Sequence, residues 1–199
     1  ALEQPSAAIG LALVARRGHD PDIAKLLRHD LEERANSELR GALCIAVGLS
    51  GDLEAAPIVR KLASERGDPE VRAQAAMALG LLGDRDGGPP VLRALLQDPS
   101  STTQREAAYA LGMLGDREAV KVLLDLVEDG GSVYVQGSAA VALGRIGGSE
   151  SVASLTAMLR DKRRPAIARA MAAVSLGLLL DRTEGRRLSS IGADLDWYA

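Results

Sequence analysis

The feature that most constrains this chain is a sequence repeat of 32 or 33 residues. Residues 78–84 read ALGLLGD, and residues 110–116 read ALGMLGD. The first glycine of this motif recurs at Gly48, Gly80, Gly112, Gly144 and Gly177. A fixed period of this length indicates a repeat architecture, in which stacked units share one continuous core.

Each unit is predicted to hold two helices. In one unit, apolar residues spaced three and four apart mark one face of a longer helix: Val71, Ala75, Leu79 and Leu82. A glycine then suits the left-handed end of that helix, and the aspartate after it suits the start of the next. The second, shorter helix is exemplified by residues 119–127, with Val120, Leu123, Leu124 and Val127 on its apolar side.

The composition favours closely packed helices. The chain has 199 residues, 47% hydrophobic but only 2% aromatic, with no Phe, so its core must consist mainly of Ala, Leu and Val. Strand formers are too scarce for a β-sandwich or barrel. We therefore expect an all-α fold, an α-solenoid of about six stacked antiparallel helix pairs in a single domain over residues 1–199. The expected units are 1–34, 35–66, 67–98, 99–130, 131–163 and 164–199.

The pattern VRAQAAMALGLLGD at residues 71–84 resembles the HEAT repeat family, specifically the short HEAT-like repeats first associated with phycobilisome chromophore lyases. The resemblance implies a curved solenoid with a concave inner surface. It also implies a ladder that links an inter-helix Asp with an Arg at the start of the longer helix. Asp68 and Arg72 fit this ladder, whereas Gln104 and Gln136 replace the arginine in two later units.

A second stripe on the longer helices is the candidate binding surface. Positions 73, 77 and 81 follow an i, i+4, i+8 line beside the core-facing stripe, and the family resemblance places this line on the concave surface. Because these helices are apolar on nearly their whole circumference, we expect a protein or peptide partner to cover the line. The candidate partner-binding residues are Ile45, Leu49, Gln74, Met77, Leu81, Arg105, Glu106, Tyr109, Met113, Val141, Arg145, Val174 and Leu178.

The charge and the cysteine content of the chain limit the classes of partner and the cellular compartment that we expect. The net charge of −3 argues against a nucleic-acid partner. A local basic cluster could contact an acidic partner, and it consists of Arg160, Lys162, Arg163 and Arg164. No apolar stretch approaches the ~20 residues that a membrane span needs, so no membrane insertion is expected. A single cysteine, Cys44, excludes a disulfide framework and suggests a cytoplasmic protein in which Cys44 replaces a buried alanine.

The sequence predicts no catalysis, no cofactor and no metal site. Both histidines precede an aspartate, as His19-Asp20 and His29-Asp30, whereas similar repeat proteins with hydroxylase activity use His-Glu pairs to hold iron. A non-catalytic interaction scaffold is therefore the expected function. One alternative is a phycobilin-lyase-like protein that handles a tetrapyrrole in a pocket begun by Glu106 and Tyr109. Another is a structural domain that packs against a neighbouring domain of its own chain.

The last residues suggest a cap. Residues 188–199 keep weak helical spacing in Leu188, Ile191 and Leu195, followed by Trp197 and Tyr198. Terminal units of a repeat protein must shield the last stacked face. We therefore expect Trp197 to cover the apolar end of the sixth unit.

Overall fold

The structure, a computed structural model, describes residues 5–33, 37–129 and 131–180. In these ranges it contains α-helices and two short 3-10 helices but no strand, which confirms the predicted all-α fold. None of the helices in these ranges is both long and apolar enough to cross a membrane. The expected cap at Trp197 and Tyr198 lies outside the described residues.

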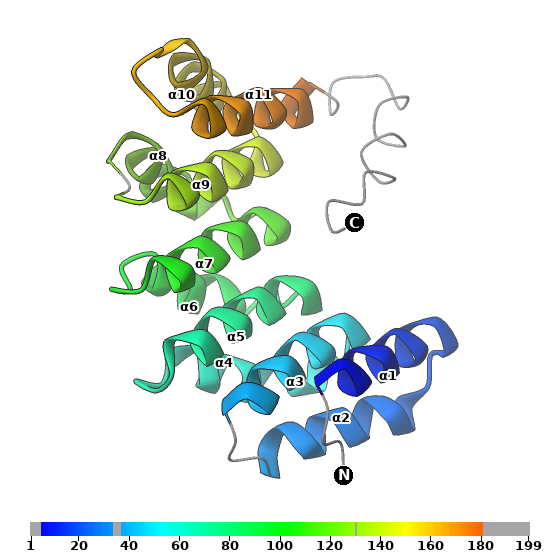
Figure 1. Cartoon of the computed structure of the whole chain (residues 1–199). Coiled ribbons are helices and arrows are strands. Elements are labelled where there is room, and N and C mark those ends of the chain that lie inside the picture. The colour runs from blue at the N-terminus through cyan, green and yellow to red at the C-terminus, as the bar shows by residue number, and fades with distance from the viewer. Residues whose placement is uncertain (1–4, 34–36, 130, 181–199) are drawn as a thin grey trace.

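The helices form two stacked rows (Figure 1). The first row is α1 (Pro5–Gly18), α3 (Ser37–Ser50), α5 (Pro69–Leu82), α7 (Ser101–Leu114), α9 (Val133–Ile146) and α11 (Ala166–Leu180). The second row is α2 (Pro21–Glu33), α4 (Ala56–Ser64), α6 (Gly88–Leu95), α8 (Val120–Asp129) and α10 (Ser149–Arg160). Each first-row helix packs on the next first-row helix, and each second-row helix packs mainly on the first-row helix that follows it. This arrangement confirms the α-solenoid.

The first-row helices lie unusually close together because of their glycines. A Cβ atom added at Gly80 would come within 2.9 Å of the Cα of Ala110, and one at Gly112 within 2.6 Å of the Cα of Ala142. These distances leave no room for a side chain against the neighbouring backbone. One turn earlier, small and fully buried residues hold the same face of each helix: Cys44, Ala76, Ala108 and Ala140.

The turns after the first-row helices follow the predicted chemistry. Gly83 and Gly115 end α5 and α7 with left-handed backbones, at φ values of 73° and 71°. The side chains of Asp52 and Asp116 accept hydrogen bonds from backbone N–H groups two residues later and so begin the 3-10 helices Leu53–Ala55 and Arg117–Ala119. The glycine and aspartate of the repeat therefore have separate roles in one turn.

The same aspartates carry a series of ion pairs, which we call the turn ladder. Each rung joins an arginine of a second-row helix to the aspartate after the next first-row helix. The rungs are Arg28–Asp52 at 3.0 Å, Arg60–Asp84 at 3.1 Å and Arg93–Asp116 at 2.9 Å. In the next unit the corresponding positions are Asp125 and Gly148, which cannot form such a pair.

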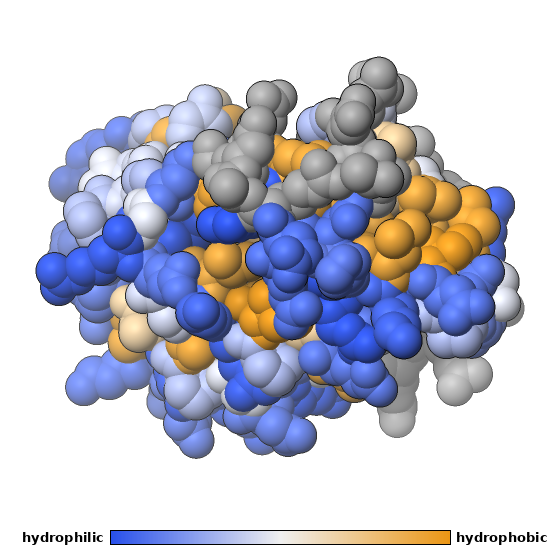
Figure 2. All heavy atoms as spheres, turned by 90° about the horizontal axis from the view of Figure 1, so that it is seen from below, coloured by the Kyte–Doolittle hydropathy of each residue, from blue (hydrophilic) through white to orange (hydrophobic). Residues whose placement is uncertain are grey.

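Figure 2 views the molecule from the α1–α2 end, where an apolar area lies beside a largely polar surface. Exposed large apolar side chains on these two helices are Leu13, Val14 and Leu26. Leu13 lies 33 residues before Ala46, so it occupies the position at which every later first-row helix has a buried Ala or Ser. The outward face of α1 therefore carries a large residue, Leu13, where the later first-row helices carry a small one.

We predict that Gly112→Ala lowers the free energy of unfolding by about 1–2 kcal/mol, because overpacking against Ala142 exceeds the gain in helix propensity. The matched control is Gly10→Ala in α1, where an added Cβ meets nothing within 4 Å. That change should raise stability by about 0.5–1 kcal/mol. Urea unfolding followed by circular dichroism measures both. Equal stabilisation by the two substitutions would contradict the close packing.

Candidate functional site

A single hollow is lined by four consecutive first-row helices, α1, α3, α5 and α7. Its volume is 450 Å³. The residues that line it are Pro5, Ile9, Ala42, Ile45, Glu70, Ala73, Gln74, Met77, Thr102, Arg105 and Glu106. Apolar side chains from three helices thus meet a group of charged and amide side chains at one place on the first row.

The structure places the predicted partner-binding residues in two groups. Five of them line the hollow: Ile45, Gln74, Met77, Arg105 and Glu106. The others lie on the same row of helices without lining it: Leu49, Leu81, Tyr109, Met113, Val141, Arg145, Val174 and Leu178. All are half-buried except Val174 and Leu178 on α11, which are exposed. Neighbouring first-row helices therefore cover part of the line without sealing it.

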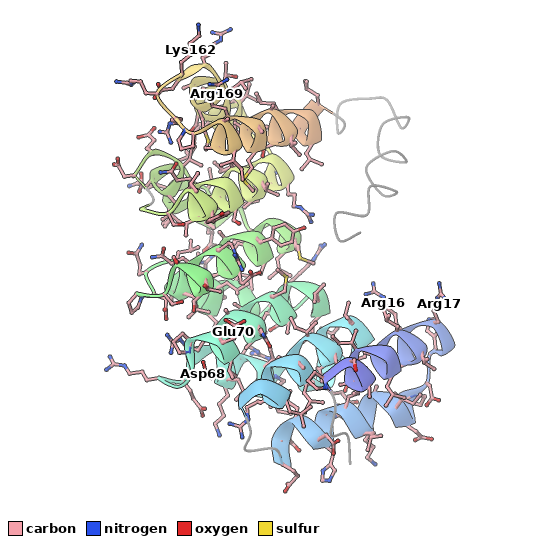
Figure 3. The ribbon with its side chains drawn as sticks, in the orientation of Figure 1. Arg16, Arg17, Asp68, Glu70, Lys162 and Arg169 are labelled. Atoms are coloured by element: carbon pink, nitrogen blue, oxygen red, sulfur yellow. The ribbon has the colours of Figure 1, made fainter. Side chains whose placement is uncertain are left out.

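The polar side chains of the hollow contact one another. Gln74 Nε2 donates to Glu70 Oε1 at 3.0 Å, while the Gln74 Oε1 atom is buried and accepts no hydrogen bond from the described residues. Arg105 donates from Nε and Nη2 to Glu106 Oε1 at 2.9 and 2.6 Å. Figure 3 shows Glu70 at the start of α5. The hollow therefore presents one exposed carboxylate and one Arg–Glu pair beside its apolar residues.

Tyr109 and Arg145 form a second polar feature of the predicted line. Arg145 Nη2 donates to the Tyr109 hydroxyl at 2.8 Å, and its guanidinium carbon lies 4.7 Å from the centre of the Tyr109 ring. This combination of a hydrogen bond and a cation–π contact joins α9 to α7. These contacts fix the two side chains relative to each other on the predicted binding line.

Sequence reasoning left α1 out of the site. Pro5 and Ile9 line the hollow, and so do Glu70 and Thr102 at the starts of α5 and α7. Ile9 could have been found, because it lies 33 residues before Ala42 and so has the phase of a site position. Glu70 and Thr102 each lie one turn before a predicted residue, Gln74 and Glu106, on the same helix face.

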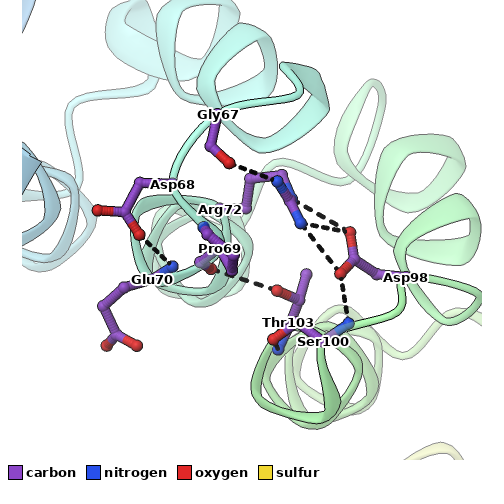
Figure 4. Close-up of polar contacts among 8 residues, drawn as sticks. All are labelled: Gly67, Asp68, Pro69, Glu70, Arg72, Asp98, Ser100 and Thr103. Carbon is purple, nitrogen blue, oxygen red and sulfur yellow. Dashed lines mark hydrogen bonds and ion pairs between the residues drawn. The ribbon is translucent and has the colours of Figure 1, made fainter.

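The predicted pairing of Asp68 with Arg72 is wrong. Arg72 donates from Nε and Nη2 to the two oxygens of Asp98, each at 3.1 Å, and from Nη1 to the Gly67 carbonyl at 2.8 Å (Figure 4). Asp68 instead caps α5 by accepting the Glu70 N–H at 2.9 Å. The reason is geometric, because the capping position directs Asp68 at its own helix, while Arg72 lies one turn later and reaches the following linker.

The glutamine that replaces the arginine in α9 has an arginine partner from the following linker. Arg164 donates from Nη1 to Gln136 Oε1 at 3.2 Å and to the Val127 carbonyl at 2.7 Å. Its Nη2 donates to the Glu128 carbonyl at 3.3 Å. Here the donor arginine lies in the linker and the acceptor lies on the helix. In the Arg72–Asp98 pair the donor lies on the helix and the acceptor in the linker.

The predicted basic cluster is divided by these contacts. Arg164 is engaged as a cap on the end of α8, and Arg163 pairs with Asp161 at 3.0 Å. The hydrogen bond from the Arg163 side chain lowers the pKa of the Asp161 carboxyl below its ordinary value. Arg160 and Lys162 are exposed, and Figure 3 shows Lys162 at the α10–α11 end of the molecule. The local excess of positive charge therefore resides mainly on these two residues.

The cysteine and the two histidines lie in different environments. Cys44 is fully buried, and this burial raises the pKa of its thiol to about 12. His19 and His29 are both exposed. Across residues 5–33, 37–129 and 131–180, no group of three or more His, Cys, Asp or Glu side chains lies close enough together to hold a metal ion.

Comparisons with known proteins agree on the architecture. A profile of the family described as HEAT repeats matches residues 23–93 and 88–177. No curated protein matches the chain. A crystal structure of an engineered protein is 23% identical with a TM-score of 0.63, and the alignment covers 89% of this chain and 90% of that one.

The structures of two natural proteins also align with this chain. Human deoxyhypusine hydroxylase, solved in complex with glycerol, is 19% identical with a TM-score of 0.53, over 89% of this chain and 81% of that one. The complex of CpcE and CpcF of phycocyanin lyase from Nostoc is 19% identical with a TM-score of 0.44, over 90% of this chain and 96% of that one. At 19% and 23% identity, the matches to the hydroxylase and to the engineered protein describe the fold alone.

We predict that Cys44 resists alkylation in the folded protein. With a pKa of about 12, the thiolate fraction at pH 8 is on the order of 10⁻⁴, and the buried sulfur is also shielded from reagents. Iodoacetamide at pH 8, followed by mass spectrometry, should leave the native protein unmodified and label it fully in urea. Rapid labelling of the native protein would show that α3 is not packed as described.

Proposed function

Since the chain belongs to the HEAT repeat family, we propose that it is a non-catalytic scaffold that binds a protein or peptide segment along the concave face of its first-row helices. The observation that supports this most is the hollow, in which half-buried apolar residues of α3 and α5 lie beside polar side chains of α5 and α7. A surface of this composition suits a partner with an apolar anchor and a polar periphery.

The apolar part of the hollow would supply most of the affinity. Ile45 and Met77 are only half-buried, so a partner side chain seated on them removes further apolar surface from water. At ~25 cal/mol per Å², covering ~100 Å² contributes about 2.5 kcal/mol. Ile45 and Met77 lie on α3 and α5, which each pack against a first-row helix on both sides. The scaffold is therefore already ordered, and binding loses little of its conformational entropy.

The polar part would fix the orientation of the partner. Glu70 is exposed at the edge of the hollow, and the pair of Arg105 and Glu106 lies next to it. A cationic group on the partner would find its best contact at Glu70, whose exposed carboxylate accepts a hydrogen bond from the Gln74 amide. An additional contact with an acidic surface would use Arg160 and Lys162, since Arg163 and Arg164 are engaged within the protein.

The structure gives less support to a tetrapyrrole site. The two residues that would begin such a pocket, Glu106 and Tyr109, already bond to Arg105 and Arg145. Of the two, only Glu106 lines the hollow. A bilin would therefore have to break internal contacts before it could use these groups, whereas a peptide on Ile45 and Met77 would not.

Selection of peptides from a random phage-displayed library on the immobilised full chain tests the proposal. Peptides that bind the hollow should lose at least ~10-fold in affinity, about 1.4 kcal/mol, on Met77→Asp, because an ionised carboxylate would be placed under their apolar anchor. Glu70→Lys, an exposed change, should weaken peptides that carry a cationic residue. Fluorescence anisotropy with the synthesised peptides measures both effects.

Val152→Asp is the matched control, since it replaces an exposed apolar residue of the second row by the same charge. It should leave the affinity unchanged, and circular dichroism should show the same helix content in all variants. Selected peptides that bind Met77→Asp and Glu70→Lys as tightly as they bind the original chain would place the binding surface elsewhere and refute the proposal.

A further inference from the structure

The last described first-row helix, α11, exposes an apolar face, and α3, α5, α7 and α9 bury part of the corresponding face. Ile167 and Val174 of α11 are 48% and 52% exposed, and Ala173 is exposed as well. The residues in the position of Ala173 on α3, α5, α7 and α9 are fully buried: Cys44, Ala76, Ala108 and Ala140. In Figure 1, α11 is the last helix of the row among the described residues, so no described helix packs on this face. We call Ile167, Ala170, Ala173, Val174 and Gly177 the terminal face.

The terminal face continues the interface that joins the other helices. A Cβ added at Gly144 of α9 would come 2.7 Å from the backbone oxygen of Ser175, whereas a Cβ at Gly177 meets nothing within 4 Å. Gly177 has the same phase in the repeat as Gly144, one 33-residue step later. This face therefore has the shape against which a further helix packs throughout the row, and it is apolar along its whole length.

We propose that residues 181–199 of this chain cover the terminal face, with Trp197 packed against α11. The proposal rests on the fold and is independent of the proposed binding function. The segment follows Leu180 directly, and it carries apolar residues at helical spacing, Leu188, Ile191 and Leu195, before its two aromatic residues. Such a stripe is what an exposed apolar helix face of this length requires as a complement.

Tethering favours this segment over a second molecule. A segment joined to Leu180 by a short stretch of chain experiences an effective concentration in the millimolar range. A second copy at ~1 μM would need contacts about 1,000-fold stronger to compete for the same face. The direct continuation of the chain is therefore the favoured occupant.

The other end of the molecule also argues against head-to-tail stacking of two copies. Within the row, Gly48 of one helix contacts Ala78 of the next. If α1 of a second copy packed on α11 in the same way, its Leu13 would contact Gly177. At that contact a Cβ on the glycine would lie only 3.0 Å from the Ala78 backbone, so the larger leucine does not fit the same approach. The first helix is thus unsuited to cover the last.

The chain contains one tryptophan, which makes the proposal directly measurable. In the full chain, Trp197 should show blue-shifted emission and protection from acrylamide quenching. Gly177→Glu places a charge on the terminal face without a clash with the described residues and with a gain in helix propensity. It should shift the emission to the red and raise the quenching constant at least two-fold.

Gly10→Glu is the control, because Gly10 is also an exposed helical glycine with nothing within 4 Å of an added Cβ, at the opposite end of the row. It should leave the emission and quenching unchanged. A Trp197 that is fully quenchable in the original chain, or one that Gly177→Glu does not affect, overturns the proposal. Protection that disappears on dilution, with a matching change in mass by analytical ultracentrifugation, would assign the terminal face to a second copy and overturn it as well.

Discussion

The close contact of glycine-bearing helices determines the rest of this structure. A chain with almost no aromatic residues cannot fill wide gaps between helices, so it gains packing by bringing backbones together. Each contact of Gly48, Gly80, Gly112 or Gly144 with the next helix is short enough to exclude a side chain. Since the same contact recurs at one phase of the repeat, it fixes the spacing of the row, and with it the position of the hollow.

The sequence was a sufficient basis for predicting the architecture because the repeat encodes it redundantly. The period, the small-residue positions and the Gly–Asp turns each indicate helices in the same places, and the structure agrees at Gly83, Gly115, Asp52 and Asp116. Local patterns of this kind act within one or two helical turns. They are therefore readable without knowledge of which distant segments meet.

The features that could not be predicted all depend on how one unit meets the next. Asp68 precedes α5 and Asp98 lies in the linker between α6 and α7, and the sequence does not indicate which of them Arg72 reaches. Ile9 lines the hollow because α1 continues the row formed by α3, α5 and α7. The sequence indicates this only weakly, because Ala15 replaces the first glycine of the repeat motif in α1. The contact of Tyr109 with Arg145 depends on side-chain conformations across two helices, which helical periodicity does not specify.

The interruption of the turn ladder has a mechanical consequence. Three regularly spaced cross-braces, from Arg28–Asp52 to Arg93–Asp116, tie successive units together across the turns. At the turn after α9, Gly147 and Gly148 have φ values of 90° and 111°, and Asp125 and Gly148 have no charges of opposite sign to join. The turn after α9 therefore lacks the ionic restraint on bending that the turns after α3, α5 and α7 share.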